Sequence, residues 1–303
     1  MPSLKAIRRR IGSVKNTQKI TKAMKLVAAA RLRRATQRIT ELRPYAKKVA
    51  EVLRAVVAKV DTGDADKPPH PLLVDRPERK KAYVLLITSD RGLAGAFNSN
   101  AIRAGERRKK ELLEQGFEDV KFVTIGRKGR DHLRRRSEVV AHDHTGATER
   151  PDKRAPEIAR ELMDEFIDGT IDQLDIVFTE FRSAVTQNIR VETVLPVTLD
   201  KGADGAAGGA DGSDGGGTEY LFEPDKDALL ERLLPMYVET TLYRAILDSL
   251  ASEHGARMTA MDNATRNAKE MISSLTLEYN RARQAAITKE LMEIIGGAEA
   301  LKG

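Results

Sequence analysis

The stretch 89–98, SDRGLAGAFN, has the composition and position of a loop that binds phosphate. It follows an apolar run of buried-strand type and precedes a helix-like segment, which is where α/β folds hold phosphate groups. It lacks both the Gly-x-Gly-x-x-Gly spacing of a dinucleotide loop and the Gly-Lys-Ser/Thr of a Walker loop. Gly92 and Gly95 alone favour a structural turn or a protein contact over nucleotide binding.

A second group with chemical potential is His142, Asp143 and His144. Two histidines in alternate positions can share a metal ion, but no third or fourth ligand follows at a recognisable spacing. We therefore interpret this group as a solvated loop and predict no metal site. His254 lies on the apolar seam of the last segment and is interpreted as a packed histidine.

The remaining chemistry is excluded by composition or absent as a motif. The chain has no Cys, which excludes disulfides, thiolate metal sites and thiol nucleophiles. It contains no Gly-x-Ser-x-Gly, no His-Glu-x-x-His and no pair of carboxylates that stands out from the solvated acids. We predict a protein without catalytic residues and without a cofactor.

Positive charge is concentrated at the N-terminus. Residues 15–34, KNTQKITKAMKLVAAARLRR, carry seven Lys or Arg and no acid, and residues 1–60 hold 17 Lys and Arg against Glu41 and Glu51, a net charge of +15. The segments 61–223 and 224–303 have net charges of −6 and −2. Such a block predicts a polyanionic partner, which can be a nucleic acid, an anionic lipid or an acidic protein surface.

The nucleic-acid alternative is a basic coiled-coil protein that neutralises phosphates with this first helix. A second basic cluster, RKGRDHLRRR (127–136), is better interpreted as a solvated helix face or a contact with acidic loops. Aromatic residues make up only 4% of the chain, which is little for stacking on single-stranded bases.

Two long helices are predicted at the ends of the chain. Residues 3–60 have an apolar seam through Leu4 and Ile7 that fades through NTQKIT and returns at Met24 and Val27. Pro44 lies within this helix and marks a kink or a break. Residues 225–298 have a similar seam, disturbed only by Pro235 and predicted to end at Gly296 and Gly297. We expect the two helices to pair as an antiparallel coiled coil.

The middle of the chain alternates strands and helices and predicts an inserted, open-sheet α/β domain of Rossmann-like type. The five expected strands are 82–88, 121–126, 137–142, 172–181 and 188–199, the last of which can pair antiparallel with 218–223. Residues 201–217 contain eight Gly among Asp, Ala and Ser and predict a flexible loop. The expected organisation is a helix at 1–60, an α/β domain at 80–223 and a helix at 224–303.

Three stretches resemble the γ subunit of bacterial-type F-type ATP synthases. They are ITKAMKLVAAARLRR (20–34), SDRGLAGAFN (89–98) and the C-terminal ASEHGARMTAMDNATRNAKEMI and LEYNRARQAAITKELMEIIGGAEAL (251–272 and 277–301). The resemblance runs end to end in order. It implies a non-catalytic central rotor shaft that couples rotation of the membrane c ring to the catalytic αβ hexamer.

The resemblance also implies partners and contact residues. The positions matching hexamer contacts are Met24, Lys25, Arg257, Arg283, Gln284, Thr288 and Glu290, and those matching contacts with the c ring are Tyr220 and Glu223. The implied partners are the α, β and ε subunits and the c ring, with one copy of this chain per complex and no nucleic acid.

The implied location is peripheral, on the cytoplasmic face of the bacterial inner membrane. No stretch approaches the roughly 20 apolar residues of a membrane span. The chain departs from many relatives at Ala94 and Ala96, where Cys or Gly is common, and in the length of the insertion 201–217.

Overall fold

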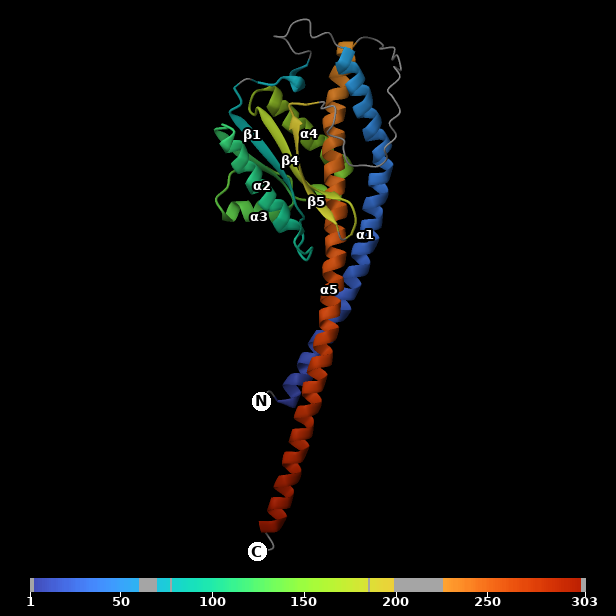
Figure 1. Ribbon diagram of the computed structural model, residues 1–303, viewed down its shortest axis with the longest axis vertical. Helices are drawn as coiled ribbons and strands as arrows, with labels where there is room; N and C mark the ends of the chain where they lie inside the picture. Colours follow the sequence, from blue (N-terminus) through green and yellow to red (C-terminus); the bar gives the residue numbers. More distant parts are fainter. Residues whose placement is uncertain (1–2, 60–69, 77, 185, 199–225, 301–303) are drawn as a thin grey trace. The chain divides into compact units, whose positions relative to one another are not determined.

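The computed structural model describes residues 3–59, 70–76, 78–184, 186–198 and 226–300 (Figure 1). The chain forms two compact units: a helix-pair unit of Met1–Ala30 and Arg257–Gly303, and a sheet unit of Arg31–Ala256. Helices α1 (Leu4–Lys59) and α5 (Lys226–Ala300) each contribute to both units. We predicted a division at the ends of helices and strands, into 1–60, 80–223 and 224–303. The two units of the structure are instead divided by which residues contact one another.

Both terminal helices are present and continuous, so the break considered at Pro44 does not occur. Pro44 lies inside α1 and Pro235 inside α5 without ending either helix. The predicted stop at Gly296 and Gly297 is wrong, because α5 continues to Ala300. A glycine in a helix interior is destabilising by only about 1 kcal/mol relative to Ala and does not by itself terminate the helix.

The predicted open α/β sheet is confirmed. Its strands are β1 (Lys81–Ile87), β2 (Asp119–Ile125), β3 (Val140–Asp143), β4 (Gln173–Phe181) and β5 (Gln187–Leu195), in the order β3-β2-β1-β4-β5. The first four are parallel and β5 is antiparallel to β4. The proposed partner of β5 at 218–223 and the loop at 201–217 lie outside the described residues.

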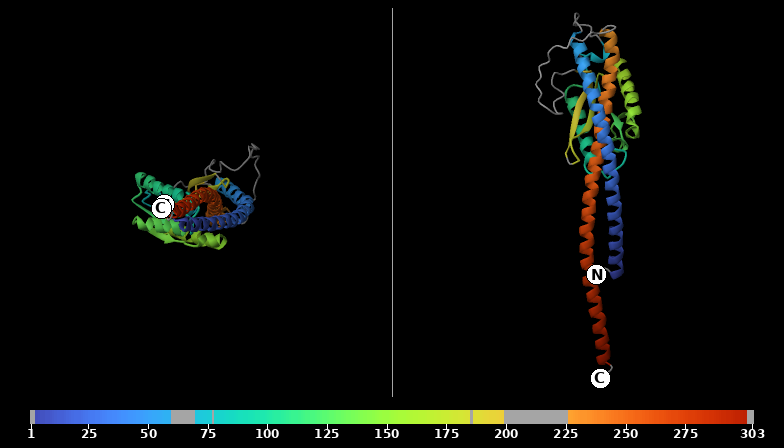
Figure 2. Two further views of the ribbon diagram at one scale, coloured as in Figure 1. Left: turned by 90° about the horizontal axis from the view of Figure 1, so that it is seen from below. Right: turned by 90° about the vertical axis from the view of Figure 1, so that its right-hand side faces the viewer.

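Helices cover both faces of this sheet (Figures 1 and 2). Strand β1 shows why, since its alternate residues point to opposite faces. Val84 and Leu86 pack in the cluster formed by α2 (Phe97–Glu114) and α3 (Arg127–Arg135). Leu85 and Ile87 pack in the cluster formed by α4 (Pro151–Ile167) and the first half of α5. Short 3₁₀ turns lie at Pro71–Leu73 and Ala147–Glu149.

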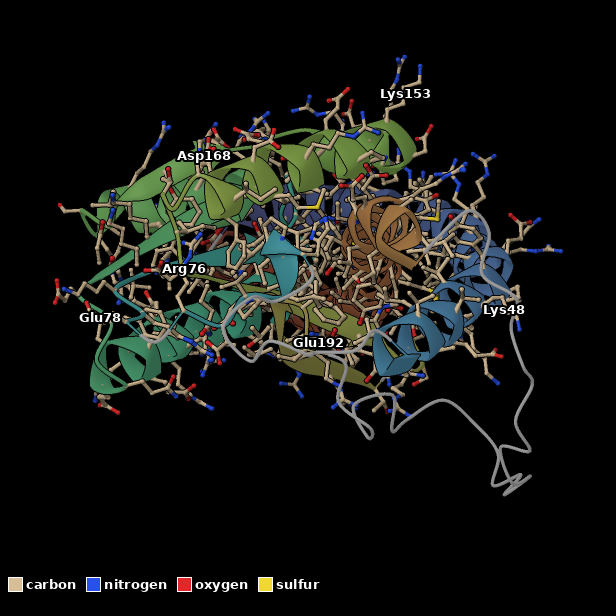
Figure 3. All side chains as sticks on the ribbon, turned by 90° about the horizontal axis from the view of Figure 1, so that it is seen from above. Lys48, Arg76, Glu78, Lys153, Asp168 and Glu192 are labelled. Atoms are coloured by element: carbon tan, nitrogen blue, oxygen red, sulfur yellow. The ribbon has the colours of Figure 1, made fainter. Side chains whose placement is uncertain are left out.

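Many charged side chains lie at the surface of these layers, as Lys48 and Lys153 do at the periphery of the sheet unit (Figure 3). Others are buried, among them Asp175 and Asp248. Arg76 donates hydrogen bonds to the carbonyl oxygens of Phe166 and Ile171 and pairs with Asp172 at 2.9 Å. This arginine holds the segment before β1 against the end of α4.

Beside the end of β4, helix α5 provides the hydrogen-bond partners that a neighbouring strand would otherwise provide. The pairing of β1 with β4 stops at Val177, which leaves the backbone of Thr179 without a β1 partner. The amide of Thr179 donates to Ser249 Oγ at 3.2 Å, and Ser252 Oγ donates to the Thr179 carbonyl at 3.1 Å. These two serines attach α5 to the sheet by hydrogen bonds between buried groups, where losing a partner is expensive.

Asp248 lies next to these serines and is 7% exposed. Burial raises the pKa of its carboxyl to about 6, although Arg244 and the Phe181 amide oppose the shift. A carboxyl whose pKa is raised on folding stabilises the fold least when it is ionised. Its contribution therefore falls as pH rises from about 4 to about 6 and is constant above that.

Replacing Asp248 with Asn should remove this pH dependence. We expect the variant to gain roughly 1–3 kcal/mol in free energy of unfolding over the wild type at pH 8, and much less at pH 4. Urea unfolding of both chains at the two pH values measures the difference. A difference that does not change with pH would contradict the raised pKa.

Gly126, at the turn from β2 into α3, allows a test of the close packing between this turn and Thr88. Its φ is +98°, and a Cβ there would collide with the backbone carbonyl of Thr88. Gly116 has a similar φ of +101° but nothing within 4 Å of a Cβ. We expect Gly126→Ala to lower the free energy of unfolding by at least about 2 kcal/mol more than Gly116→Ala, measured by urea unfolding. Equal losses would mean that backbone strain alone matters at both positions.

Candidate functional site

The helix-pair unit is an antiparallel coiled coil whose seam combines large and small side chains. Apart from Arg257, its buried residues recur at intervals of seven or fourteen along both helices: Ile7, Thr21 and Ala28 on α1, and Met261, Ala268 and Leu275 on α5. This repeat is the seven-residue period of coiled coils. A hydrogen bond of 2.8 Å joins Thr21 Oγ1 to Thr265 Oγ1 and sets the register.

The seam differs from the predicted one in its middle. Val27, a predicted seam residue, is 53% exposed, while Thr21 within the supposed interruption is 8% exposed. Alternating steps of three and four residues lead from Ile7 through Thr21 to Ala28, and the apolar-only pattern missed this path. Thr21 can be buried because its hydroxyl bonds to Thr265.

Lys25, a predicted hexamer contact, already has a partner within the chain. Its Nζ lies 2.6 Å from Asp262 Oδ1 on α5, and the ammonium lowers the pKa of Asp262. The neighbouring Met24 is half-buried. The chain's own α5 therefore provides an acidic partner for Lys25. Lys15, Lys19 and Lys22 are exposed.

The other predicted hexamer contacts fall into two groups. Arg257 is only 9% exposed, so the chain offers little of this guanidinium to a partner. Arg283, Gln284, Thr288 and Glu290 are all exposed near the end of α5. The hydroxyl of Thr288 donates to the backbone carbonyl of Gln284 at 2.9 Å, one turn earlier in α5.

These exposed residues lie where α1 no longer accompanies α5. Because both helices rise equally per residue, the pairing of Thr21 with Thr265 places Leu4 level with about residue 282 of α5. Beyond this point α5 carries large apolar side chains that are at least half exposed: Ile287, Leu291, Met292, Ile294 and Ile295. Clustered apolar exposure of this kind marks a protein–protein contact. In the sequence, the apolar seam of α5 continues beyond the length that α1 can cover. This difference in length is the signal that could have revealed the contact surface.

The predicted ring contacts Tyr220 and Glu223 lie outside the described residues. In the sequence they lie between the Gly/Asp-rich stretch 201–217 and α5.

Polar side chains of the loop 89–98 bond to backbone groups of the protein. Asn98 Oδ1 accepts from the Ser89 amide at 2.9 Å, and Asp90 Oδ1 accepts from the Arg127 amide at 2.9 Å. Asp90 thus places a carboxylate at the N-terminus of α3, which the helix dipole favours. This arrangement agrees with the structural turn preferred from the sequence.

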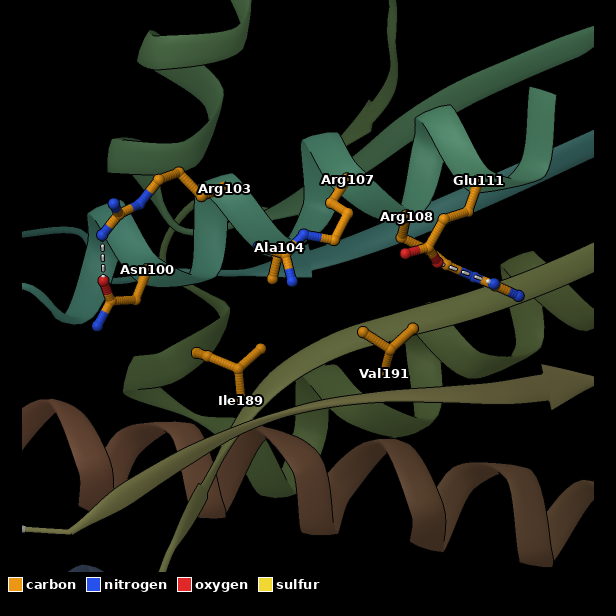
Figure 4. Close-up of a pocket in the computed structure, with 8 residues that line it drawn as sticks. All are labelled: Asn100, Arg103, Ala104, Arg107, Arg108, Glu111, Ile189 and Val191. Carbon is orange, nitrogen blue, oxygen red and sulfur yellow. Dashed lines mark hydrogen bonds and ion pairs between the residues drawn. The ribbon is translucent and has the colours of Figure 1, made fainter. Parts of the chain in front are cut away.

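A cavity of about 420 Å³ lies on the outer surface between α2 and β5 (Figure 4). Its basic side chains are partly engaged: Arg108 pairs with the buried Asp175 at 2.7 Å, and Arg103 donates to Asn100 at 2.6 Å. Ile189 and Val191 form its β5 side. No general acid–base pair lines it.

The histidine group is not the solvated loop we predicted. His144 is 7% exposed, and His142 is half-buried and contacts Glu161 and Glu165 of α4. The sequence showed no further ligand near the histidines, because these carboxylates lie about twenty residues further along the chain. His254 is buried at 6% exposure, as predicted. In the basic cluster 127–136, Arg130 pairs with Asp143 at 3.1 Å, in agreement with a contact to an acidic loop.

Comparisons with known proteins agree with the resemblance over the whole chain. A model of the ATP synthase family matches residues 3–301. The ATP synthase gamma chain of Sorangium cellulosum is 50% identical over 328 aligned residues, and that of a Geobacter species is 48% identical over 303, with both chains fully covered in each case.

Solved structures share the fold at lower identity. A chain of the Euglena gracilis mitochondrial ATP synthase has a TM-score of 0.64 at 20% identity and covers 98% of this chain and 94% of its own. A chain from the central stalk and c ring of the Tetrahymena thermophila enzyme has a TM-score of 0.57 at 24% identity, over 81% and 99%.

The structural matches define the class: two long terminal helices that flank an α/β unit in the sequence. The sequence matches then give the family, because they are full-length and about half identical. The chain belongs to the ATP synthase gamma-chain family. The nucleic-acid alternative receives no support from any of them.

The Thr21–Thr265 pair gives a test of the seam. Thr21→Val alone leaves the Thr265 hydroxyl without its cross-helix partner and should lower the free energy of unfolding by about 1 kcal/mol. Changing both residues to Val removes both polar groups and should be less destabilising than the sum of the single changes. Thermal unfolding of the four chains measures this coupling. Additive effects would show that the hydrogen bond does not contribute.

Proposed function

We propose that this chain is the central rotor subunit of an F-type ATP synthase. In this role it couples proton-driven rotation of a c ring to conformational cycling of a catalytic αβ hexamer. The observation that carries the proposal is the full-length, 50% identity to an ATP synthase gamma chain. The exposed apolar end of α5, which requires a partner, supports it independently.

The rotor acts without bond chemistry of its own. A helix pair with unlike faces presents a different surface to each of three catalytic sites as it turns. Each site then takes the conformation that binds the face opposite it, so the rotor is a ligand whose position selects among states. Thr21, Ala28 and Ala268 in the seam let the two helices approach closely there, which suits a pair that must fit inside a central cavity.

The contacts with the hexamer follow from charge and exposure. Met24 and Lys25 face acidic loops of the β subunits, and the exposed Lys22 and Lys19 extend the same positive surface. Arg283, Gln284, Thr288 and Glu290 provide polar contacts near the end of α5. Arg257 matches a further hexamer contact, although only 9% of it is exposed in the chain alone.

The remaining partners lie on the membrane side. The sheet unit meets the ε subunit and, through Tyr220 and Glu223, the polar loops of the c ring. None of the helices in the described residues has the length and apolar character to cross a bilayer. As the gamma chain of such a complex, the chain is proposed to be peripheral, in one copy per complex, on the cytoplasmic face of the inner membrane, with neither cofactor nor catalytic residue.

Isolation from native membranes tests this function. A tagged chain should bring ATP synthase α and β subunits with it, together with ATP hydrolysis activity. Recovery without α and β subunits would contradict the proposal. Retention of the purified chain on DNA in a salt-dependent manner would favour the nucleic-acid alternative instead.

A charge swap at Lys25 separates coupling from folding. Lys25→Glu places two carboxylates together, and adding Asp262→Lys restores the ion pair with its charges exchanged. Because the pair is exposed, both changes should affect stability little. We expect proton-driven ATP synthesis per assembled complex to fall in both variants. Full recovery in the double variant would mean that Lys25 serves only the helix pair.

A further inference from the structure

Four side chains from two elements of the sheet unit converge on one point. His142 on β3 and His144 just after it lie two residues apart, and Glu161 and Glu165 lie one turn apart on α4. His142 Nε2 is 2.6 Å from Glu165 Oε1, and His142 Nδ1 is 3.1 Å from Glu161 Oε1. His144 Nε2 is 3.5 Å from Glu161 Oε2.

Two buried atoms in this cluster are not satisfied. His144 Nε2 and Glu165 Oε2 have no hydrogen-bond partner among the described residues. His144 is 7% exposed, and its ring is directed at the glutamates. Buried polar atoms are nearly always paired, so a pair of unsatisfied atoms in one cluster indicates a missing bound species.

We propose that His142, His144, Glu161 and Glu165 form a binding site for a divalent transition-metal ion, of which Zn²⁺ fits best. One ligand atom from each of His142, Glu161 and Glu165 already lies within 4.8 Å of the others. Zn²⁺ binds His nitrogen and carboxylate oxygen with four ligands, whereas Mg²⁺ and Ca²⁺ prefer oxygen alone. Two carboxylates balance the charge of the ion.

A metal ion is held by the deprotonated forms of its ligands, so one ring nitrogen of His142 would bind it as a neutral imidazole and the two glutamates as carboxylates.

Tyr83 on β1 packs against the proposed site. Its ring lies edge-on to that of His142, with 6.0 Å between centroids. Tyr83 therefore limits the positions that this imidazole can take.

The site would join β3 to α4. Strand β3 has only four residues, lies at the edge of the sheet and pairs with β2 alone. A metal ion shared with α4 gives this strand a second attachment. The role we infer is structural, in the part of the chain that is proposed to carry torque from the ring.

Metal binding to the purified, chelator-treated full chain tests the site. We expect one Zn²⁺ per chain by calorimetry, and a rise in Tm of about 5 °C when Zn²⁺ is at 100 times its Kd. Co²⁺, which resembles Zn²⁺ in its ligands, should give a visible absorption band that Zn²⁺ displaces. Glu165→Gln and His144→Ala should each weaken Zn²⁺ binding at least tenfold.

His132→Gln is the matched control, since His132 also contacts a glutamate, Glu106 at 3.1 Å, within the sheet unit. It should leave Zn²⁺ binding unchanged. If Glu165→Gln does not fold, as judged by its metal-free Tm, Glu161→Gln replaces it. A wild-type chain that takes up no Zn²⁺, or variants that bind it as the wild type does, would overturn the proposal. An equal loss in His132→Gln would do so as well.

Discussion

The structure depends on one constraint: helix α5 has to bury apolar side chains against two different kinds of partner along its length. In the sheet unit, Leu234, Val238 and Leu242 enter the main core with α4 and the strands. In the helix-pair unit the described partner is α1, and the buried residues Met261, Ala268 and Leu275 recur every seven positions. The spacing of the buried residues along α5 follows from this change of partner.

The attachment of α5 to the sheet is polar as well as apolar. Ser249 and Ser252 bond to the Thr179 backbone where β4 extends beyond β1. Hydrophobic contacts resist separation but are non-directional, whereas buried hydrogen bonds fix the rotation of a helix about its axis. For a chain proposed to transmit torque, such directional contacts between helix and sheet are the relevant ones.

The sequence predicted the elements better than it predicted the contacts between them. Periodicity identified both terminal helices, the five strands and the sheet class, because each depends on local pattern. It misplaced Val27 and passed over Thr21, because an apolar pattern does not register a buried hydroxyl pair. The sequence pattern also gave no sign that Glu165 lies near His142, because the two are distant in the chain. Only the crossover through α4 brings His142 Nε2 to 2.6 Å from Glu165 Oε1. The partner of Lys25 was missed for the same reason, since Asp262 is adjacent in space alone.

This chain is proposed to rotate within a catalytic hexamer. The absence of native Cys allows a single thiol to be introduced at Lys153→Cys, an exposed position on α4, for attachment of a bead. With the αβ hexamer fixed to a surface, ATP should drive rotation of the bead in one direction, in steps of a third of a turn. Sustained ATP hydrolysis with a stationary bead would contradict the account.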